Sequence, residues 1–272
     1  MPSVGLGGLL LLVTIARPAT AQIDYRNLDD DRPTVTEDAY PVERYAFELL
    51  MPYRFERMVG GSRLHLTVPE LAYGLIQNGQ IGLKLPFATL TDGSSVAEPA
   101  AGSRSGLAGV SLFGFYNFNT ERARVPALAL RADVSFGVGP LGGHGTRVAV
   151  KAIATRSWGA TRLHLNVARG LGSEASLRPV DPLSRWSYGA AIDRTFFRQS
   201  LMFIGEITAR RTTEGVPTEV NAGFGLRYQW HATTVFDAGI ARRLRSDLGP
   251  DVALTVGLSH AFAIPGLMPR GR

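Results

Sequence analysis

The sequence contains no cysteine, and only two of its 29 basic residues, Lys84 and Lys151, are lysines. Without cysteine the chain forms no disulfide and offers no thiolate for catalysis or metal binding. Arginine carries nearly all the positive charge and is scattered along the chain, whereas nucleic-acid-binding proteins gather such charge in a patch or run. Beyond the N-terminal segment, no apolar run approaches the roughly 20 residues of a membrane-spanning helix. A helical membrane protein, a thiol enzyme and a nucleic-acid partner are therefore not expected.

The two ends of the chain differ in composition from its middle. Residues 1–21 are predicted to be a secretory signal, because an apolar run at 4–15 is followed by the small residues Ala19-Thr20-Ala21. Residues 22–41 are acidic, turn-rich and without periodicity. Two interpretations of this segment are open: a solvated periplasmic tail, which the composition favours, or a plug or gate folded into a more basic lumen. Residues 263–272 are expected to be a C-terminal tail.

The middle of the chain shows the two-residue period of β-strands. Leu71, Tyr73 and Leu75 alternate with small or polar residues before Asn78-Gly79, and the alternation resumes after that turn. About twelve such segments, each of roughly 10–14 residues, fill positions 42–262, and this is near the length that a tilted strand needs to cross a bilayer. The parity changes at Pro69-Glu70, where we expect a bulge.

The connections and the aromatic residues support the same fold. Short turns are expected at 78–79, 119–124, 157–159, 198–200 and 230–231, and longer outer loops at 91–104, 139–145, 170–184 and 244–250. Aromatic residues fall near both ends of the strands, as Tyr53 and Tyr116 illustrate. The sequence therefore predicts an all-β protein: a closed antiparallel transmembrane β-barrel, built as an up-and-down meander. We expect a monomer in the outer membrane of a Gram-negative bacterium, with outer-membrane lipid as its surroundings.

Several stretches resemble the family of outer-membrane transporters named for the meta-pathway of phenol degradation (MetA-pathway). They are ELAYGLIQNGQIGLKLPF at 70–87, PALALRADVSFGVG at 126–139, TRLHLNVARG at 161–170, and the closing hairpin from Phe224 to Phe262. The likeness spans most of the chain after the signal as a diffuse pattern, without a catalytic signature. It implies a β-barrel that moves hydrophobic or aromatic compounds across the outer membrane.

Polar residues on the inward face of the expected strands are candidates for lining the lumen. They are Glu48, Arg54, Arg131, Asp133, Arg147, Lys151, Arg162, His164, Asp193, Glu206, Arg210, Glu219, Arg227, Asp237 and Arg243. These charges either form a narrow polar passage or satisfy one another in a lumen too small to conduct. We expect His164 to be a hydrogen-bonding group rather than a base.

Signals for catalysis or cofactor binding are weak. No G-x-S-x-G motif occurs, and Ser259 and His260 are neighbours on a strand, so they face opposite ways. No histidine pair has metal-ligand spacing, and no cofactor is expected. The function predicted is passive passage of small hydrophobic or aromatic solutes through the barrel. The alternative is a closed barrel with a structural or loop-mediated binding role, and an outer-membrane barrel enzyme is the least favoured.

Overall fold

A computed structural model of the chain describes residues 23–92, 102–172, 180, 184–196, 200–211, 217–245 and 249–268. The predicted signal at 1–21 therefore lies outside the described residues, as do 269–272 of the predicted tail. The strands of the first half are β1 Ala46–Met58, β2 Arg63–Thr67, β3 Glu70–Ile76, β4 Gly79–Lys84, β5 Phe87–Thr91, β6 Ser103–Leu107, β7 Val110–Asn119 and β8 Ala127–Phe136. Those of the second half are β9 Thr146–Trp158, β10 Thr161–Leu171, β11 Trp186–Phe196, β12 Leu201–Arg211, β13 Glu219–His231, β14 Thr234–Arg245 and β15 Pro250–Ala263.

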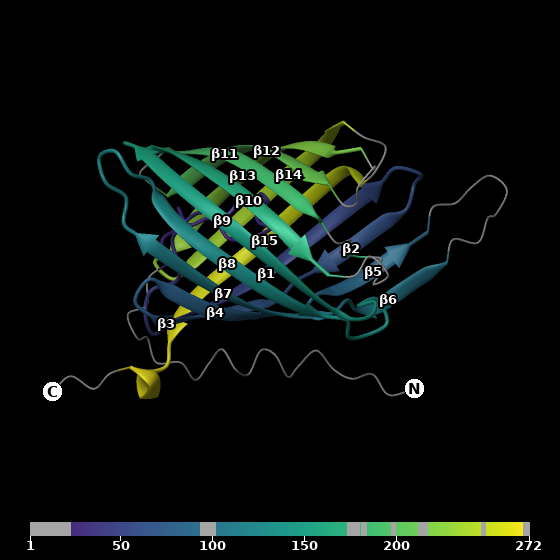
Figure 1. Cartoon of the computed structure of the whole chain (residues 1–272), viewed down its shortest axis with the longest axis horizontal. Helices are drawn as coiled ribbons and strands as arrows, with labels where there is room; N and C mark the ends of the chain where they lie inside the picture. Colours follow the sequence, from purple (N-terminus) through teal and green to yellow (C-terminus); the bar gives the residue numbers. More distant parts are fainter. Residues whose placement is uncertain are drawn as a thin grey trace.

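These strands form one antiparallel sheet that closes on itself, because β15 pairs with β1 along the whole length of both (Figure 1). β2 and β3 are two halves of one long strand, since both pair with β1 in a single register. β4 with β5, and β6 with β7, are likewise halves of long strands. Counted this way, the sheet is a closed barrel of twelve antiparallel strands, and the fold class predicted from the sequence is confirmed. Closure gives each of the twelve long strands a partner on both sides, as hydrocarbon surroundings require, although the half formed by β6 pairs with β5 alone.

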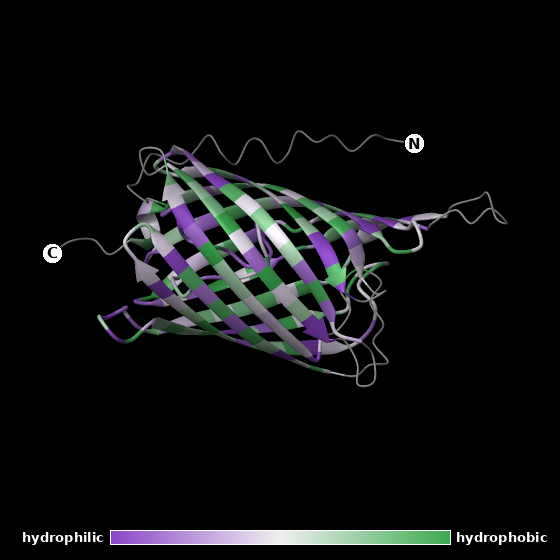
Figure 2. Cartoon of the chain, turned by 90° about the horizontal axis from the view of Figure 1, so that it is seen from above, coloured by the Kyte–Doolittle hydropathy of each residue, from purple (hydrophilic) through white to green (hydrophobic). Residues whose placement is uncertain are grey.

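The two faces of the sheet differ in chemistry as the alternation predicts. Along β8 the side chains of Ala127, Ala129 and Arg131 are buried inside the barrel, whereas Leu128 and Leu130 are about 40% exposed on its outside. Figure 2 shows the resulting change between hydrophilic and hydrophobic colouring along the strands. Large apolar side chains are exposed on strands all around the barrel, and lipid would cover such a surface.

Several connections differ in detail from the sequence prediction, among them the turn expected at 157–159, which is Gly159-Ala160 because β9 continues through Trp158. The turn expected at Trp230-His231 is wrong, because β13 continues through His231 and the turn is Ala232-Thr233. At the hairpin of β3 and β4 the turn residues are Gln77 and Asn78, the latter with a φ of 62°, and Gly79 already belongs to β4. The bulge expected at Pro69-Glu70 is wrong, because β2 and β3 keep a single register with β1, and only the strand is interrupted, at Val68-Pro69. In each case pairing with a neighbouring strand, which the local pattern does not show, decides the boundary.

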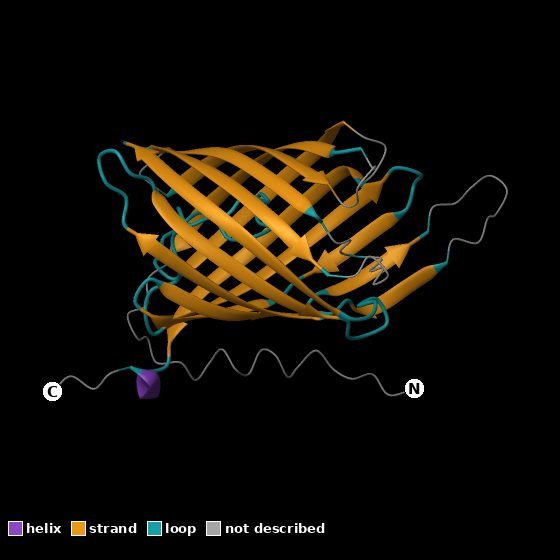
Figure 3. Cartoon of the chain, viewed as in Figure 1, coloured by secondary structure: helices purple, strands orange, loops and turns teal. Residues whose placement is uncertain are grey.

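In the part of the chain that the structure describes, strands make up nearly all the regular structure, and a 3-10 turn, Pro265–Leu267, follows β15 (Figure 3). Within the described residues, no helix has the length and apolar character required to span a membrane. Residues 23–45 precede β1 and carry no strand of their own. Their contacts lie inside the barrel, as the next subsection shows.

Candidate functional site

The candidate site is the segment of residues 23–44, here called the plug, together with the inner barrel wall that holds it. The plug begins at the end of the barrel that carries the turn between β13 and β14, since the Ile23 N–H donates to the Ala232 carbonyl at 2.9 Å. It returns to the same end, where the Tyr45 N–H bonds the Gly74 carbonyl at 2.7 Å. Between these points the chain forms a loop inside the barrel. The favoured interpretation of residues 22–41 as a solvated tail is therefore wrong for the described part of that segment.

The base of the plug is held by apolar contacts. Ile23, Tyr25 and Leu28 are buried in a cluster with inward-facing residues of the barrel end, among them Met202 and Ile204. Burial of side chains of this size contributes about 1.5–3 kcal/mol each. The sequence does not predict these apolar contacts, because residues 22–41 are mainly acidic and only three large apolar residues make the contacts.

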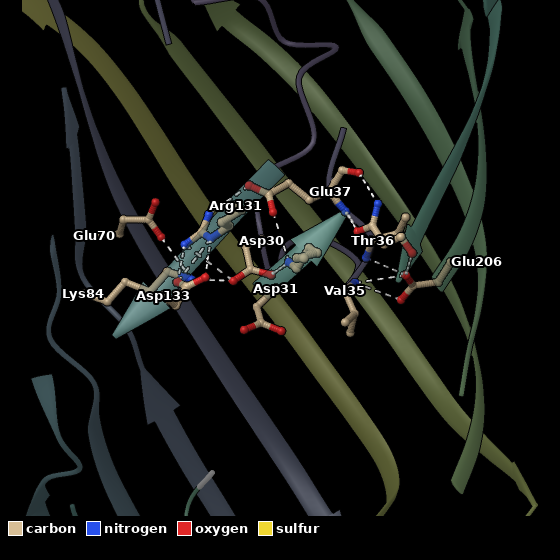
Figure 4. A network of polar contacts seen from close by, with 12 residues as sticks. Asp30, Asp31, Val35, Thr36, Glu37, Glu70, Lys84, Arg131, Asp133 and Glu206 are labelled. Carbon is tan, nitrogen blue, oxygen red and sulfur yellow. Dashed lines mark hydrogen bonds and ion pairs between the residues drawn. The ribbon is translucent and has the colours of Figure 1, made fainter. Parts of the chain in front are cut away.

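The tip of the plug is held by charge. Asp30 lies between two ammonium groups. Lys84 Nζ is 2.6 Å from its carboxylate (Figure 4), and Lys151 Nζ contacts its other oxygen. Although burial opposes ionisation, these two cations hold the pKa of Asp30 well below its usual value. Lys151 also reaches Glu37 at 3.0 Å, and Arg131 binds Glu37 at 2.9 Å. Two acidic plug residues thus neutralise a basic patch on strands β4, β8 and β9.

A second charged cluster lies on the opposite wall. Arg32 of the plug binds Asp237 of β14 at 3.2 Å and donates to the Ser259 hydroxyl at 2.5 Å. It also pairs with Asp29 at 2.8 Å, and Arg227 of β13 reaches the same Asp29 carboxylate at 2.9 Å. Arg32, Arg227 and Asp237 are almost completely buried, so this network has little screening by water.

Backbone groups of the plug are bound by side chains of the wall. Glu206 of β12 accepts hydrogen bonds from the N–H groups of Val35 and Thr36 and from the Thr36 hydroxyl, all at 3.0 Å. Asn166 of β10 bonds both the N–H and the carbonyl of Glu37 at 2.8 Å. Side chains of the wall therefore supply hydrogen-bond partners to the backbone of a segment that has no secondary structure of its own. Buried backbone groups require such partners.

Asp38 and His164 belong to one buried chain of polar contacts. Arg162 binds Asp38 at 3.1 Å and Asp193 at 2.8 Å, and the His164 Nε2 lies 2.8 Å from the same Asp193. The other ring nitrogen of His164 lies 3.0 Å from the Thr155 hydroxyl. Burial, only partly offset by Arg162, raises the pKa of Asp38 to about 7. Both nitrogens of His164 are thus engaged by neighbouring strands.

The wall carries glycine where the plug comes closest. A β-carbon on Gly239 would lie 2.3 Å from the Pro33 carbonyl oxygen, and one on Gly225 would lie 2.9 Å from the Pro33 ring. A β-carbon on Gly189 would lie 2.7 Å from the Thr36 hydroxyl. These three positions on β11, β13 and β14 leave room for residues 33–36 of the plug.

A cavity of about 310 Å³ lies against the tip of the plug, on the side of the outer loops. Its floor includes Asp30, Asp31 and Val35 of the plug. An adjoining space of about 180 Å³ shares several of its lining residues, Arg54 and Arg210 among them. The lumen is thus occupied by the plug towards one end and hollow above it.

The structure places all the sequence-predicted lumen residues and shows what they contact. Ten of them are buried: Glu48, Arg131, Arg147, Arg162, His164, Asp193, Glu206, Glu219, Arg227 and Asp237. Arg54, Asp133, Lys151 and Arg210 line the two spaces above the plug, and Arg243 lies 3.6 Å from Asp251. Several of these residues bind the plug rather than border an open passage.

Other residues of the site are absent from that prediction. Lys84, Asn166 and Ser259 all bind plug residues directly, and all three occupy inward positions in the alternating pattern. The pattern could therefore have identified them, but the roles of the wall glycines depend on the path of the plug. Ser259 and His260 do not form a dyad: Ser259 binds Arg32 and Arg227, and His260 lies 3.0 Å from the Thr234 hydroxyl.

No protein-family model and no curated protein matches this sequence. Its structure is similar to an outer-membrane channel from Pseudomonas putida F1, with a TM-score of 0.65 and 14% identity, over 86% of this chain and 100% of the channel. It is similar to the KdgM porin with a TM-score of 0.54 and 10% identity, over 79% of this chain and 99% of the porin. The NanC porin gives a TM-score of 0.50 and 8% identity, over 80% and 100%.

These similarities concern the fold, which is that of the outer-membrane β-barrels. Together with the apolar outer surface, they identify the chain as an outer-membrane barrel of a Gram-negative bacterium. The three similar structures are channels or porins rather than enzymes.

Proposed function

We propose that the protein is an outer-membrane channel for the passive passage of small hydrophobic or aromatic molecules, with the plug as its gate. The observation that supports this proposal is the cavity of about 310 Å³ between the plug and the outer loops. An apolar cavity of about 150 Å³ holds benzene, so this space has the size for a one-ring or two-ring solute. The protein supplies no energy source, and the solute moves down its own concentration gradient.

The lining of the cavity supports the solute class. Leu66, Val68 and Ala108 form an apolar wall, and the charged groups around the cavity are paired, as Arg210 is with Glu219 at 3.0 Å. Because these charges are paired, the lining attracts neither cations nor anions, and a solute without net charge, such as tryptophan, is favoured. The resemblance to transporters named for phenol degradation points to the same class of solute, and we propose that relationship as well.

The gate is supported by the way in which the plug is held. Hydrogen bonds, ion pairs and apolar contacts hold residues 23–44, and the chain has no cysteine to fix them covalently. A segment held in this way can leave the lumen and return to it. The runner-up function is a closed barrel with a structural or loop-mediated role, and the number of buried ion pairs on the plug favours it.

A disulfide lock distinguishes the two functions. A β-carbon on Gly189 would lie 3.6 Å from the Thr36 β-carbon, within the range of about 3.5–4.5 Å that disulfides adopt. The variant T36C/G189C would therefore tie the plug to β11, and no native cysteine competes. Its matched controls are T36C and G189C alone. Flux of tryptophan and of arabinose into proteoliposomes is compared before and after reduction, with empty liposomes as the blank.

For a gated channel we expect tryptophan flux to be at the blank when the disulfide is closed and to rise above it on reduction. The single-cysteine variants should respond to neither oxidation nor reduction. Little arabinose flux beside tryptophan flux would support selectivity for aromatic solutes, and equal flux would indicate a general pore. No flux of either solute through the wild type and the reduced variant would overturn the channel function and favour the closed barrel.

A further inference from the structure

Charged side chains are distributed unequally between the two faces of the barrel wall. Of the acidic residues in the described strands, all but Asp251 face the lumen, as Asp193 and Glu206 do. Arginines also occupy lipid-facing positions, and those near the outer ends of their strands are Arg57, Arg63, Arg169, Arg211 and Arg242. The outer rim of the lipid-facing surface is therefore positively charged.

Two of these arginines flank one aromatic ring on neighbouring strands. Arg169 of β10 is the register partner of Trp186 of β11, and Trp186 is in turn the register partner of Arg211 of β12. Their side chains face away from the lumen, because Ser187 and Arg210 beside them line it. Since neighbouring strands lie about 4.8 Å apart, the Cα atoms of Arg169 and Arg211 are about 10 Å apart. These two arginines and Trp186 are here called the rim site.

The guanidinium groups of the rim site are accessible to a ligand. The guanidinium carbon of Arg169 lies 4.9 Å from the centre of the Trp186 ring, and an arginine stacked in this way keeps the N–H donors at its edge free. Arg169 and Arg211 are both exposed, and neither has an acidic partner among the described residues. By contrast, Arg57 at the outer end of β1 binds Asp251 at 3.1 Å. The rim site therefore has positive charge without a counter-charge of its own.

The rim site lies at the level of the lipid headgroups. Trp186 begins β11 and Arg211 ends β12, so the site is at the ends of these strands that face the outer loops. The ring of Trp186 stacks on that of Tyr188 with 6.2 Å between their centres, and such amphipathic rings favour the membrane interface. Towards the middle of the barrel the surface is apolar, with Val167 and Ile207 exposed. Cationic groups thus lie directly above a surface suited to acyl chains.

We propose that the rim site binds the phosphate groups of lipid A, the membrane anchor of lipopolysaccharide in the outer leaflet. Lipid A carries phosphates at the headgroup level and acyl chains beneath them, so it matches both the charge of the rim site and the apolar surface below. The planar fork of arginine binds phosphate through paired hydrogen bonds, and two such forks flank Trp186. This contact holds the barrel in its membrane, and it stands whether or not the lumen conducts.

Lipid binding to the purified full-length barrel in detergent tests the rim site, with Trp186 as the reporter. The other two tryptophans, Trp158 and Trp230, lie at the inner ends of β9 and β13, and the changes W158F/W230F leave Trp186 as the sole tryptophan. Its fluorescence is followed during titration with lipid A, with lipid A freed of its phosphates, with phosphatidylglycerol and with inorganic phosphate.

Three further variants are made in this single-tryptophan protein. R169Q/R211Q removes both cations of the rim site, and R169K/R211K keeps the charge but not the fork of N–H donors. R124Q/R194Q is the matched control, because it removes two exposed arginines at the opposite end of the barrel. The mobility of unheated protein in gel electrophoresis shows that each variant is a folded barrel.

We expect lipid A to change the Trp186 fluorescence at concentrations at which the phosphate-free lipid and inorganic phosphate do not. R169Q/R211Q should bind lipid A roughly tenfold more weakly, because basic groups near a membrane surface attract anionic lipid. R169K/R211K should lie between this variant and the parent protein, and R124Q/R194Q should match the parent.

Several results would overturn the assignment. They are an unchanged Trp186 signal with lipid A, equal binding of lipid A by R169Q/R211Q and the parent, and equal binding of the phosphate-free lipid. Equal binding of phosphatidylglycerol would show a general surface for anionic lipids instead, and equal binding of inorganic phosphate would show a site for the free ion. The flux of tryptophan through the lumen is measured separately, so none of these results decides the channel function.

Discussion

Gly239 of β14 lies so close to Pro33 of the plug that a β-carbon at Gly239 would be 2.3 Å from the Pro33 carbonyl oxygen. Real β-carbons do not approach a carbonyl oxygen so closely, so the wall admits the plug only because glycine stands there. A β-carbon on Gly225, on the neighbouring strand, would meet the ring of the same proline. The fit of plug to wall is therefore steric as well as electrostatic.

Substituting Gly239 with alanine should expel the tip of the plug. The obstructing atoms are backbone, which cannot move aside as a flexible side chain would, and overpacking of this kind costs about 1–3 kcal/mol. We expect Gly239→Ala to increase tryptophan flux and to expose residues 23–44 to added protease. Gly205→Ala on β12 is the matched control, since a β-carbon there meets no atom within 4 Å. If both variants behave as the wild type, the plug is not seated as described.

Removing the carboxylate of Glu206 should loosen the plug without changing the barrel. This group accepts hydrogen bonds from two backbone N–H groups and one hydroxyl of residues 35 and 36. Hydrogen bonds to a charged group contribute about 1.5–3 kcal/mol each, so Glu206→Ala should weaken plug binding by a few kcal/mol. Protease sensitivity of residues 23–44 measures this loss. Thr208→Ala on the same strand is the control and should leave the plug protected.

Most of the fold could be predicted from the sequence, because each strand carries its own evidence. The two-residue period along β8 or β15 requires no knowledge of other strands, and the alternation of loop lengths gives the order. The extent of β13 could not be predicted in this way, since it depends on the pairing of His231 with Thr234 of β14. The local pattern of residues identifies each strand, and the pairing with a neighbouring strand determines where that strand ends.

The candidate site is harder to predict from the sequence than the fold, because it depends on contacts between distant segments. Residues 22–41 have no period of their own, and their place is set by partners such as Asn166 and Glu206, more than a hundred positions away. The alignment of three prolines on neighbouring strands is not visible in the sequence for a similar reason. Pro52, Pro69 and Pro86 are ordinary interruptions one by one, and only the register of three strand pairs aligns them.

The binding of the plug should depend on pH through Asp38. An aspartate in a free segment has a pKa of about 3.9, whereas burial raises the pKa of Asp38 in the plug to about 7. Between these values the bound plug takes up a proton that the released plug does not, so binding strengthens as pH falls from 7 towards 4. The change is at most about 1.4 kcal/mol per pH unit for one group. As pH rises through this window, the plug should become easier to release.

Asp38→Asn isolates the contribution of this carboxyl group. The wild type should show tryptophan flux that rises between pH 5.5 and pH 8, and Asp38→Asn should show a flatter profile. Groups on the strands titrate in both proteins, so the difference between the profiles reports Asp38. Superimposable profiles would show that this carboxyl does not couple plug release to pH.

Two neighbouring aspartates of the plug should differ sharply in importance. Asp30 is largely buried between Lys84 and Lys151, whereas the Asp31 side chain is 51% exposed and lies 3.7 Å from Arg54. Asp30→Asn leaves two enclosed ammonium groups without their shared counter-charge, and breaking a buried pair costs about 3–5 kcal/mol. Asp31→Asn removes an exposed pair, which contributes about 1 kcal/mol or less.

Both changes remove one negative charge from the same turn of the plug, so a difference between them comes from burial. We expect Asp30→Asn to release the plug, seen as protease cleavage within residues 23–44 and tryptophan flux above the wild type, while Asp31→Asn remains protected. Equal behaviour of the two variants would mean that net charge, and not the cation pair on β4 and β9, retains the plug in the lumen.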